Sequence, residues 1–194
     1  MIIDMHMHEM RYSEDSFLRL ENMVEIAKHR GLDGICITDH DSMGLKEFAA
    51  EYSEKTGFPI FVGIEFYSLQ GDIVAFGIED YPKERIPAQE FVDLVQAQGG
   101  MCFSAHPFRN NNRGLEENLK IVKGLDGIEV LNGSTLYEAN RKAAEYAAEL
   151  GIATVGSSDC HVPEKLGIYA TYFPREIRSV QELVRSVKRC ETLP

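Results

Sequence analysis

The sequence lacks a CxxC pair, a basic segment followed by an apolar one near its start, and any apolar stretch long enough to span a bilayer. Its four cysteines are scattered at Cys36, Cys102, Cys160 and Cys190, which favours a reduced protein over a disulfide scaffold. These absences exclude a membrane-spanning chain and argue against a secretory leader. We therefore expect a cytoplasmic protein with no membrane partner.

Positive charge is also scarce, with 20 Lys and Arg against 31 Asp and Glu, for a formal net charge of −11. Non-specific binding to long nucleic acid depends on Lys and Arg at phosphates, so this balance argues against it. A small anionic substrate stays compatible, because bound cations can reverse the local field. With 194 residues, 44% of them hydrophobic, residues 1–194 are expected to form one domain.

Six apolar runs recur along the chain, and each ends in polar residues. They cover residues 2–8, 33–40, 58–65, 101–106, 126–132 and 152–161. Apolar stripes at helical spacing lie between most of them, at 20–27, 91–95, 143–150 and 180–187, and residues 69–78 predict an extra strand. Alternating strands and helices predict an α/β fold with parallel βαβ units. Polar residues gathered at strand ends favour a barrel over an open sheet, although the chain is short for a barrel of about 250 residues.

Metal-ligand residue types gather at these strand ends. Five of the six histidines lie there, and His29, in a helix, is expected to be a solvated residue. Period two places both members of the pairs His6/His8 and Asp159/His161 on one side of their strands. Mixed imidazole and carboxylate ligands suit Zn, Mn or Fe, and five histidines exceed what one tetrahedral ion needs. We expect two to three divalent ions, with Glu65 as the candidate bridging ligand.

The motifs DMHMH, ITDHDS, VGIE, AHPFR and GSSDCHVP appear in this order, and the chain resembles the PHP (polymerase and histidinol phosphatase) domain family over essentially its whole length. The resemblance implies a distorted (β/α)7 TIM-like barrel of the PHP type, with a trinuclear site at its C-terminal face. It also implies an enzyme that hydrolyses phosphoesters.

The family pattern, carried over by position, implies the following ligands. The first ion would take His6, His8, Glu65 and Asp159; the second Glu65 and His106; the third His40, His161 and an acidic residue of the loop at 9–16, which is Asp15 or, alternatively, Glu14. The fifth strand departs from the family, because it carries no histidine or cysteine. Glu129, Asn132 or water could complete the second ion, and Glu129 could instead accept a hydrogen bond from a histidine.

Metal binding lowers the pKa of water from 15.7 towards about 7, so a hydroxide held between two ions is the expected nucleophile. A third ion would neutralise charge on the phosphate. Asp159 or a nearby histidine, such as His161, is expected to move protons. Arg109 is expected to clamp phosphate, whereas Arg113 and Lys165 are expected at the surface. The polar segment 109–114 is predicted to be a substrate loop.

The leading hypothesis is therefore a metal-dependent phosphoesterase acting on a small phosphorylated metabolite or nucleotide, by phosphomonoester or phosphodiester hydrolysis. Two alternatives stay open: an amidohydrolase-type C–N bond hydrolase, and a catalytically silent metal-binding PHP module. Against the first, no lysine ends a strand to serve as a carbamate bridge. Histidinol phosphate, nucleoside bisphosphates, short oligonucleotides and sugar phosphates all stay open as substrates, as do the native metal and the oligomeric state.

Overall fold

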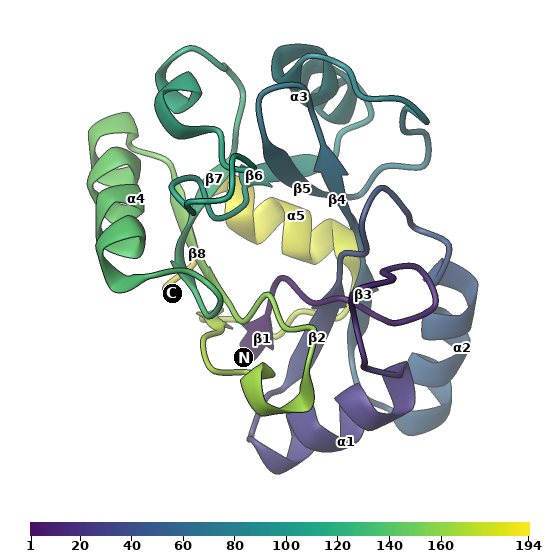
Figure 1. The fold of residues 1–194 in the computed structure, drawn as a ribbon. Coiled ribbons are helices and arrows are strands. Elements are labelled where there is room, and N and C mark those ends of the chain that lie inside the picture. The colour runs from purple at the N-terminus through teal and green to yellow at the C-terminus, as the bar shows by residue number, and fades with distance from the viewer.

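The computed structural model describes residues 1–194, which form two β-sheets with helices on their outer faces (Figure 1). The strands are β1 (Ile2–Asp4), β2 (Gly34–Ile37), β3 (Ile60–Val62), β4 (Ile64–Tyr67), β5 (Asp72–Phe76), β6 (Met101–Ser104), β7 (Gly127–Asn132), β8 (Ala153–Ser157) and β9 (Thr171–Tyr172). The helices are α1 (Leu20–His29), α2 (Lys46–Thr56), α3 (Ala88–Ala97), α4 (Tyr137–Leu150) and α5 (Val180–Lys188), with short 3-10 turns at Glu116–Lys120 and Pro163–Lys165.

The two sheets have the strand orders β3-β2-β1-β9 and β4-β5-β6-β7-β8. Beyond the assigned strands, isolated bridges join Met7 to Cys160 and His40 to Glu65, both in parallel. The sheets therefore meet at the C-terminal ends of β1, β2, β4 and β8 but do not form one continuous ladder. The α/β class is as expected; a closed seven-stranded barrel is not formed, because the strands separate towards their N-terminal ends.

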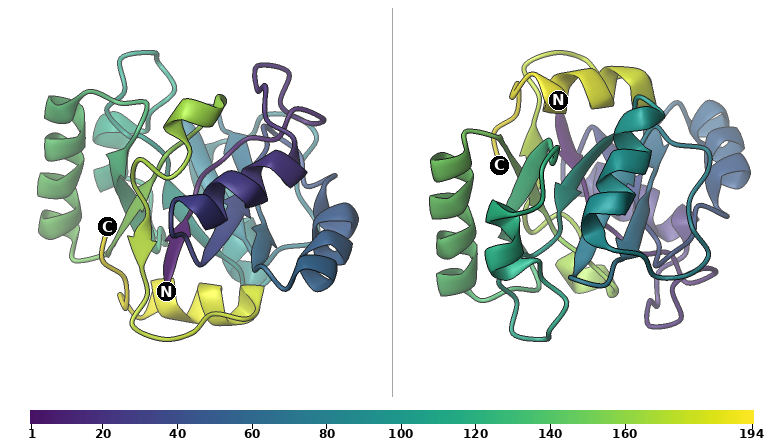
Figure 2. Two further views of the ribbon diagram at one scale, coloured as in Figure 1. Left: turned by 90° about the horizontal axis from the view of Figure 1, so that it is seen from below. Right: turned by 90° about the horizontal axis from the view of Figure 1, so that it is seen from above.

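Three apolar clusters fill the molecule. An inner cluster lies between the sheets and includes Ile3, Val74, Phe103 and Val155. One outer cluster packs α3 and α4 onto the larger sheet, and another packs α1 and α2 onto the smaller one. Helix α5 contributes apolar side chains to the inner cluster, and Figure 2 shows it lying across one end of the strands, beside the N-terminus. The opposite end is left for polar loops.

The four predicted helices are α1, α3, α4 and α5, and glycines in the left-handed region follow three of them. Gly31, Gly99 and Gly151 have φ values of 76°, 75° and 65°, a conformation that glycine adopts without strain. Helix α2 was not predicted, because Ala49 is its only buried residue and the helix has no clear apolar stripe. His29 is exposed at the end of α1, as expected.

The extra strand predicted at 69–78 is β5, which pairs antiparallel with both β4 and β6. The single run expected at 58–65 is divided by Gly63 into β3 and β4, which belong to different sheets. A Cβ on Gly63 would lie 2.4 Å from the Ala75 carbonyl oxygen, so only glycine fits where the chain passes between the sheets. Strand β9, only two residues long, was also not predicted.

None of the four cysteines forms a disulfide; three are buried and Cys190 is exposed. This agrees with the expectation from their spacing. Measured for length and hydropathy together, no helix of the structure meets the requirements for crossing a bilayer.

Candidate metal centre

Five strand ends bring the predicted ligands together on one side of the molecule. His6 and His8 follow β1, His40 follows β2, His106 follows β6, and Asp159 with His161 follows β8; Glu65 lies within β4. Their side chains form overlapping groups whose candidate donor atoms lie within 4.8 Å of one another. The gathering is a consequence of parallel strands ending at the same edge, as the sequence pattern predicted.

The first group consists of His6, His8, Glu65 and Asp159. The Nε2 atoms of His6 and His8 lie 3.1 Å apart, and Asp159 Oδ1 lies 3.6 Å and 3.2 Å from them. Glu65 Oε1 is 3.3 Å from His6 Nε2, and Glu65 Oε2 is 3.7 Å from His8 Nε2. Donors around a tetrahedral ion with bonds of about 2.1 Å lie about 3.4 Å apart. The group therefore has the dimensions of a tetrahedral ligand cage.

The second group consists of Glu65, Asp72 and His106. His106 Nε2 lies 2.9 Å from Glu65 Oε1 and 3.7 Å from Asp72 Oδ2. Glu65 thus belongs to both groups, which is the arrangement that a bridging carboxylate requires. Asp72 was not among the residues that the sequence pattern indicated.

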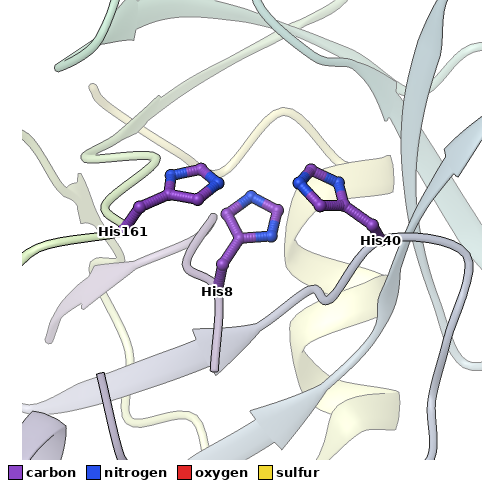
Figure 3. Close-up of side chains that lie close together, drawn as sticks. All are labelled: His8, His40 and His161. Atoms are coloured by element: carbon purple, nitrogen blue, oxygen red, sulfur yellow. The ribbon is translucent and has the colours of Figure 1, made fainter. Parts of the chain in front are cut away.

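The third group consists of His8, His40 and His161, whose rings converge in Figure 3. The ring centroids of His40 and His161 each lie 4.2 Å from that of His8. Asp15 Oδ2 lies 3.3 Å from Nε2 of both His40 and His161. Of the two loop acids considered, Asp15 is the one that reaches the group, and no contact joins Glu14 to it.

Two hydrogen-bonded acceptors orient the histidines of the first group. Glu129 Oε1 lies 3.2 Å from His6 Nδ1, and Ser13 Oγ lies 3.2 Å from His8 Nδ1 and donates to Asp39 Oδ1 at 2.8 Å. Assigning the ring proton to Nδ1 in both histidines satisfies these contacts and leaves each Nε2 as a lone pair facing the cage.

Glu129 makes four contacts that use both of its oxygens. Oε1 meets His6 Nδ1 and accepts from Ser157 Oγ, and Oε2 accepts from the backbone N–H of His106 at 2.6 Å and from Asn132 Nδ2 at 2.9 Å. It belongs to none of the candidate ligand groups. The geometry thus favours the alternative in which Glu129 accepts hydrogen bonds from the ligands' side of the site.

Asp4, expected on the same face as His6 and His8, does not reach the groups. Its carboxylate accepts from the backbone N–H groups of Ser158 at 2.9 Å and Gly167 at 3.0 Å. Assigned strand structure ends at Asp4, so the alternation of faces does not continue regularly through His8. Asp4 instead holds the loop after β8 in place.

Mutual attraction between the acids and histidines shifts their pKa values. Burial opposes charge on His6, but Asp159, Glu65 and Glu129 raise its pKa well above the usual value. Burial likewise opposes charge on Glu65 and Asp159, yet His6 lowers the pKa of both carboxyls well below the usual range. Both carboxylates therefore stay anionic, as metal ligands must be.

The fit of cations to this site follows from its buried charge. Seven carboxylate side chains are at most 2% exposed, and no lysine or arginine is among the buried side chains: Asp4, Glu9, Asp39, Glu65, Asp72, Glu129 and Asp159. Buried charges need partners or metal ions. In addition, buried His161 Nε2 and His106 Nδ1 have no hydrogen-bond partner. An acidic, imidazole-rich cluster of this kind suits divalent ions.

Two arginines stand at the mouth of the site. Arg109 hydrogen-bonds Asp159, and also Asn132 Oδ1 at 2.8 Å, and Arg113 binds both oxygens of Asp72. Both line a hollow of ≈ 170 Å³ together with members of the three groups, and none of its ten lining residues is hydrophobic. Arg109 is placed as expected. Arg113 was expected at the surface and instead lies at the mouth, whereas Lys165 hydrogen-bonds Ser134 outside the hollow.

Two of the candidate ligands have left-handed backbone conformations. His106 has φ of 27° and Asp159 has φ of 49°. Such conformations cost non-glycine residues about 1–3 kcal/mol and recur at functional sites. Here the Glu129 carboxylate, which binds the N–H of His106, helps to hold the first of them.

The comparisons with known proteins agree with this architecture. The family model described as PHP-associated matches residues 137–192. An uncharacterised protein of Methanocaldococcus jannaschii, MJ1587, is 27% identical over 140 residues, which span 66% of this chain and 80% of that protein. With the fold described above, the family match confirms the resemblance to the PHP family.

Solved structures share the fold at low sequence identity. A candidate metal-dependent phosphoesterase from Bifidobacterium adolescentis superposes with a TM-score of 0.73 at 20% identity, covering 87% of this chain and 91% of that one. An amidohydrolase from Chromobacterium violaceum gives 0.72 at 20% identity, covering 98% and 97%. A lesion-specific endonuclease from Pyrococcus furiosus gives 0.72 at 18% identity, covering 97% of this chain and 56% of the endonuclease. These similarities define the fold.

Proposed function

We propose that this PHP-type protein is a metal-dependent phosphoesterase, which hydrolyses a small phosphorylated metabolite or nucleotide at a di- or trinuclear centre. The proposed ligands are His6, His8, Glu65 and Asp159 for the first ion, Glu65 and His106 for the second, and Asp15, His40 and His161 for the third. Zn, Mn and Fe are the ions that such mixed ligands suit.

The observation that carries this proposal is the sharing of Glu65 between two adjacent donor groups. Its Oε1 lies within 3.3 Å of both His6 Nε2 and His106 Nε2. A carboxylate in this position holds two ions close to each other. Ions bound there would lower the pKa of a coordinated water towards about 7 and so make a nucleophile available near neutral pH.

The chain's own residues supply substrate binding and orientation. Arg109 and Arg113 bring two guanidinium groups to a hollow that otherwise presents carboxylates, imidazoles and one asparagine. Guanidinium groups bind phosphate oxygens through pairs of hydrogen bonds. Asp159 and His161 line the same hollow, where either could accept or return a proton. We therefore assign Asp159, His161 and Arg109 to the catalytic machinery.

The size and polarity of the hollow favour a phosphoryl group over an apolar substrate part. Its volume of ≈ 170 Å³ and purely polar lining suit a phosphate with a few adjacent atoms. The remainder of the substrate would lie outside, which is compatible with phosphomonoesters, nucleotides and short oligonucleotides. A structural neighbour acts as an endonuclease, and the neighbouring amidohydrolase was determined with bound sulfate, an anion similar to phosphate.

The two alternatives receive less support. A C–N hydrolase of the amidohydrolase type would use a lysine between its ions, and no lysine lines the hollow. A silent module would be expected to have lost ligands, whereas the three groups retain every histidine and carboxylate that the motifs predicted. Both alternatives are outcomes of the following test.

The test compares wild type with His106→Ala and His29→Ala. His106 belongs to the second group, while His29 is an exposed histidine at the far end of α1 and serves as the matched control. Wild type and His29→Ala, reconstituted with Mn²⁺, should hold two to three ions by elemental analysis and hydrolyse p-nitrophenyl phosphate or bis-p-nitrophenyl phosphate. We expect His106→Ala to lose at least about 100-fold in rate, the upper range for disturbing a partner of a metal ligand.

The outcomes separate the hypotheses. Two to three ions without hydrolysis of either ester would favour the silent module, and hydrolysis of an amide or lactam would favour the C–N hydrolase. Folded wild-type protein that holds no ion after reconstitution would contradict the proposal.

A further inference from the structure

Asp72 occupies a position that the motifs leave unassigned. It is the first residue of β5 and is fully buried. Because β5 runs antiparallel to β4 and β6, its N-terminal residue lies at the edge where those strands have their C-terminal ends. The carboxylate of Asp72 therefore enters the metal centre from the only strand of the larger sheet that runs the other way.

The second group is short of ligands without it. Glu65 and His106 provide one donor each, and the fifth parallel run offers only Glu129 and Asn132. Both Glu129 oxygens are hydrogen-bonded. Asn132 Oδ1 accepts from Arg109 and from the N–H of Ser134, and its amide Nδ2 donates to Glu129 and Asp159. The polar side chains of β7 are therefore committed to holding other residues.

Asp72 has the geometry of the missing ligand. Its Oδ2 lies 3.7 Å from His106 Nε2, a separation similar to those within the first group. Arg113 binds the carboxylate on another side, with Nε 2.6 Å from Oδ2 and a terminal nitrogen 2.9 Å from Oδ1. An oxygen has two lone pairs, so Oδ2 can accept from Arg113 and still bind an ion.

Arg113 itself is held where it can do this. A Cβ on Gly71 would lie 2.8 Å from the carbonyl oxygen of Arg113, and the N–H of Asp72 donates to that same oxygen at 2.6 Å. The guanidinium also lies 4.4 Å from the centre of the Tyr67 ring. Backbone and side chain of Arg113 thus both fix the start of β5.

We propose that Asp72 is the third protein ligand of the second ion, with Glu65 and His106, and that Arg113 positions its carboxylate. This inference rests on the metal centre of the proposed function. It assigns to an antiparallel hairpin strand the part that a histidine or cysteine on the fifth parallel run would otherwise take. A carboxylate in that place makes the second position richer in oxygen, which suits Mn²⁺.

The test is the Mn²⁺ content and affinity of four folded proteins: wild type, Asp72→Asn, Arg113→Met and Asp126→Asn. Asp126 is the matched control, since it is also a largely buried carboxylate that accepts a backbone N–H, from Cys102, but lies away from the site. Ions per chain are measured by elemental analysis and affinities by isothermal titration calorimetry, with circular dichroism to verify folding. Asp72→Ser replaces Asp72→Asn if the latter does not fold.

We expect Asp72→Asn to hold one ion fewer, or to bind one ion at least about tenfold more weakly. Arg113→Met should keep the full count, because it removes a positive charge and leaves the carboxylate, and Asp126→Asn should match wild type. If Asp72→Asn binds like wild type, or if Arg113→Met loses the same ion, Asp72 serves the salt bridge and the inference is overturned. Wild type without ions would overturn the metal centre as well, so the two failures are distinguishable.

Discussion

At the scale of single residues, the histidines of the first group are held from behind by acceptors that bind no ion. His6 Nδ1 contacts Glu129, and His8 Nδ1 reaches Asp39 through Ser13. Such contacts fix the tautomer and the ring orientation of a metal-binding histidine. The sequence placed Asp39 and Glu129 near the site, but it could not show that Ser13 joins Asp39 to His8.

Glu129→Gln tests the role of these acceptors. An amide offers one acceptor oxygen in place of two and brings an N–H₂ group against donors such as the His106 N–H. We expect every ion to be retained, with affinity lowered by about 10–100-fold, measured by calorimetric titration with Mn²⁺. Glu138→Gln, at an exposed position of α4, is the control. Loss of a whole ion would instead identify Glu129 as a ligand, the other role considered for it.

At the scale of elements, the β4–β5 hairpin packs against the loop that follows β6. The contact needs two glycines: a Cβ on Gly71 would lie 2.6 Å from the backbone of Gly114, and a Cβ on Gly114 would lie 2.1 Å from the Pro107 carbonyl oxygen. The loop at 109–114, predicted to be a substrate loop, is therefore tied to the hairpin at its C-terminal end. This contact delivers Arg113 to Asp72.

Gly114→Ala should disturb this contact. The added methyl group has no space between backbone atoms, so we expect the free energy of unfolding to fall by about 1–3 kcal/mol, as for other overpacked sites. Urea denaturation followed by circular dichroism measures the change. Asn110→Ala, at an exposed position in the same loop, should leave stability within about 0.5 kcal/mol of wild type. Equal stability of both variants would show that the loop moves away without cost.

At the scale of the whole molecule, one end of the fold is acidic and buried while the other is closed by α5. Seven buried carboxylates lie without a buried lysine or arginine, and the arginines present stand at the mouth. Mutual repulsion between buried acids opposes folding. Bound divalent ions would offset this repulsion, so folding and metal binding should be coupled.

Metal addition should therefore raise the melting temperature. At a free ion concentration about 1,000 times Kd, one site stabilises the native state by about 4 kcal/mol. For a chain of this size that corresponds to an increase in Tm of about 8–16 °C. Differential scanning fluorimetry of EDTA-treated protein, with and without added Mn²⁺, measures the shift, and His106→Ala should show a smaller one. A Tm that does not respond to metal in wild type would contradict the coupling.

The sequence by itself determined the residue types of the metal centre and four of the five helices. Alternating apolar runs that end in histidine or carboxylate predict ligands at a common edge, because parallel strands end together. The stripe and terminal glycine of α1, or of α4, are local signals, so they can be recognised without knowledge of the rest of the chain. Helix α2 lacks that stripe and could not be found in this way.

Only the tertiary structure decided which of these residues meet and which others join them. Asp72 begins a strand instead of ending one, and it reaches the site because β5 runs antiparallel. Arg113 lies at the mouth because two glycines let separate loops approach each other. Whether the strands close into a barrel likewise depends on pairing between segments far apart in the chain. Such contacts are set by packing across the whole molecule, and no local pattern in the sequence encodes them.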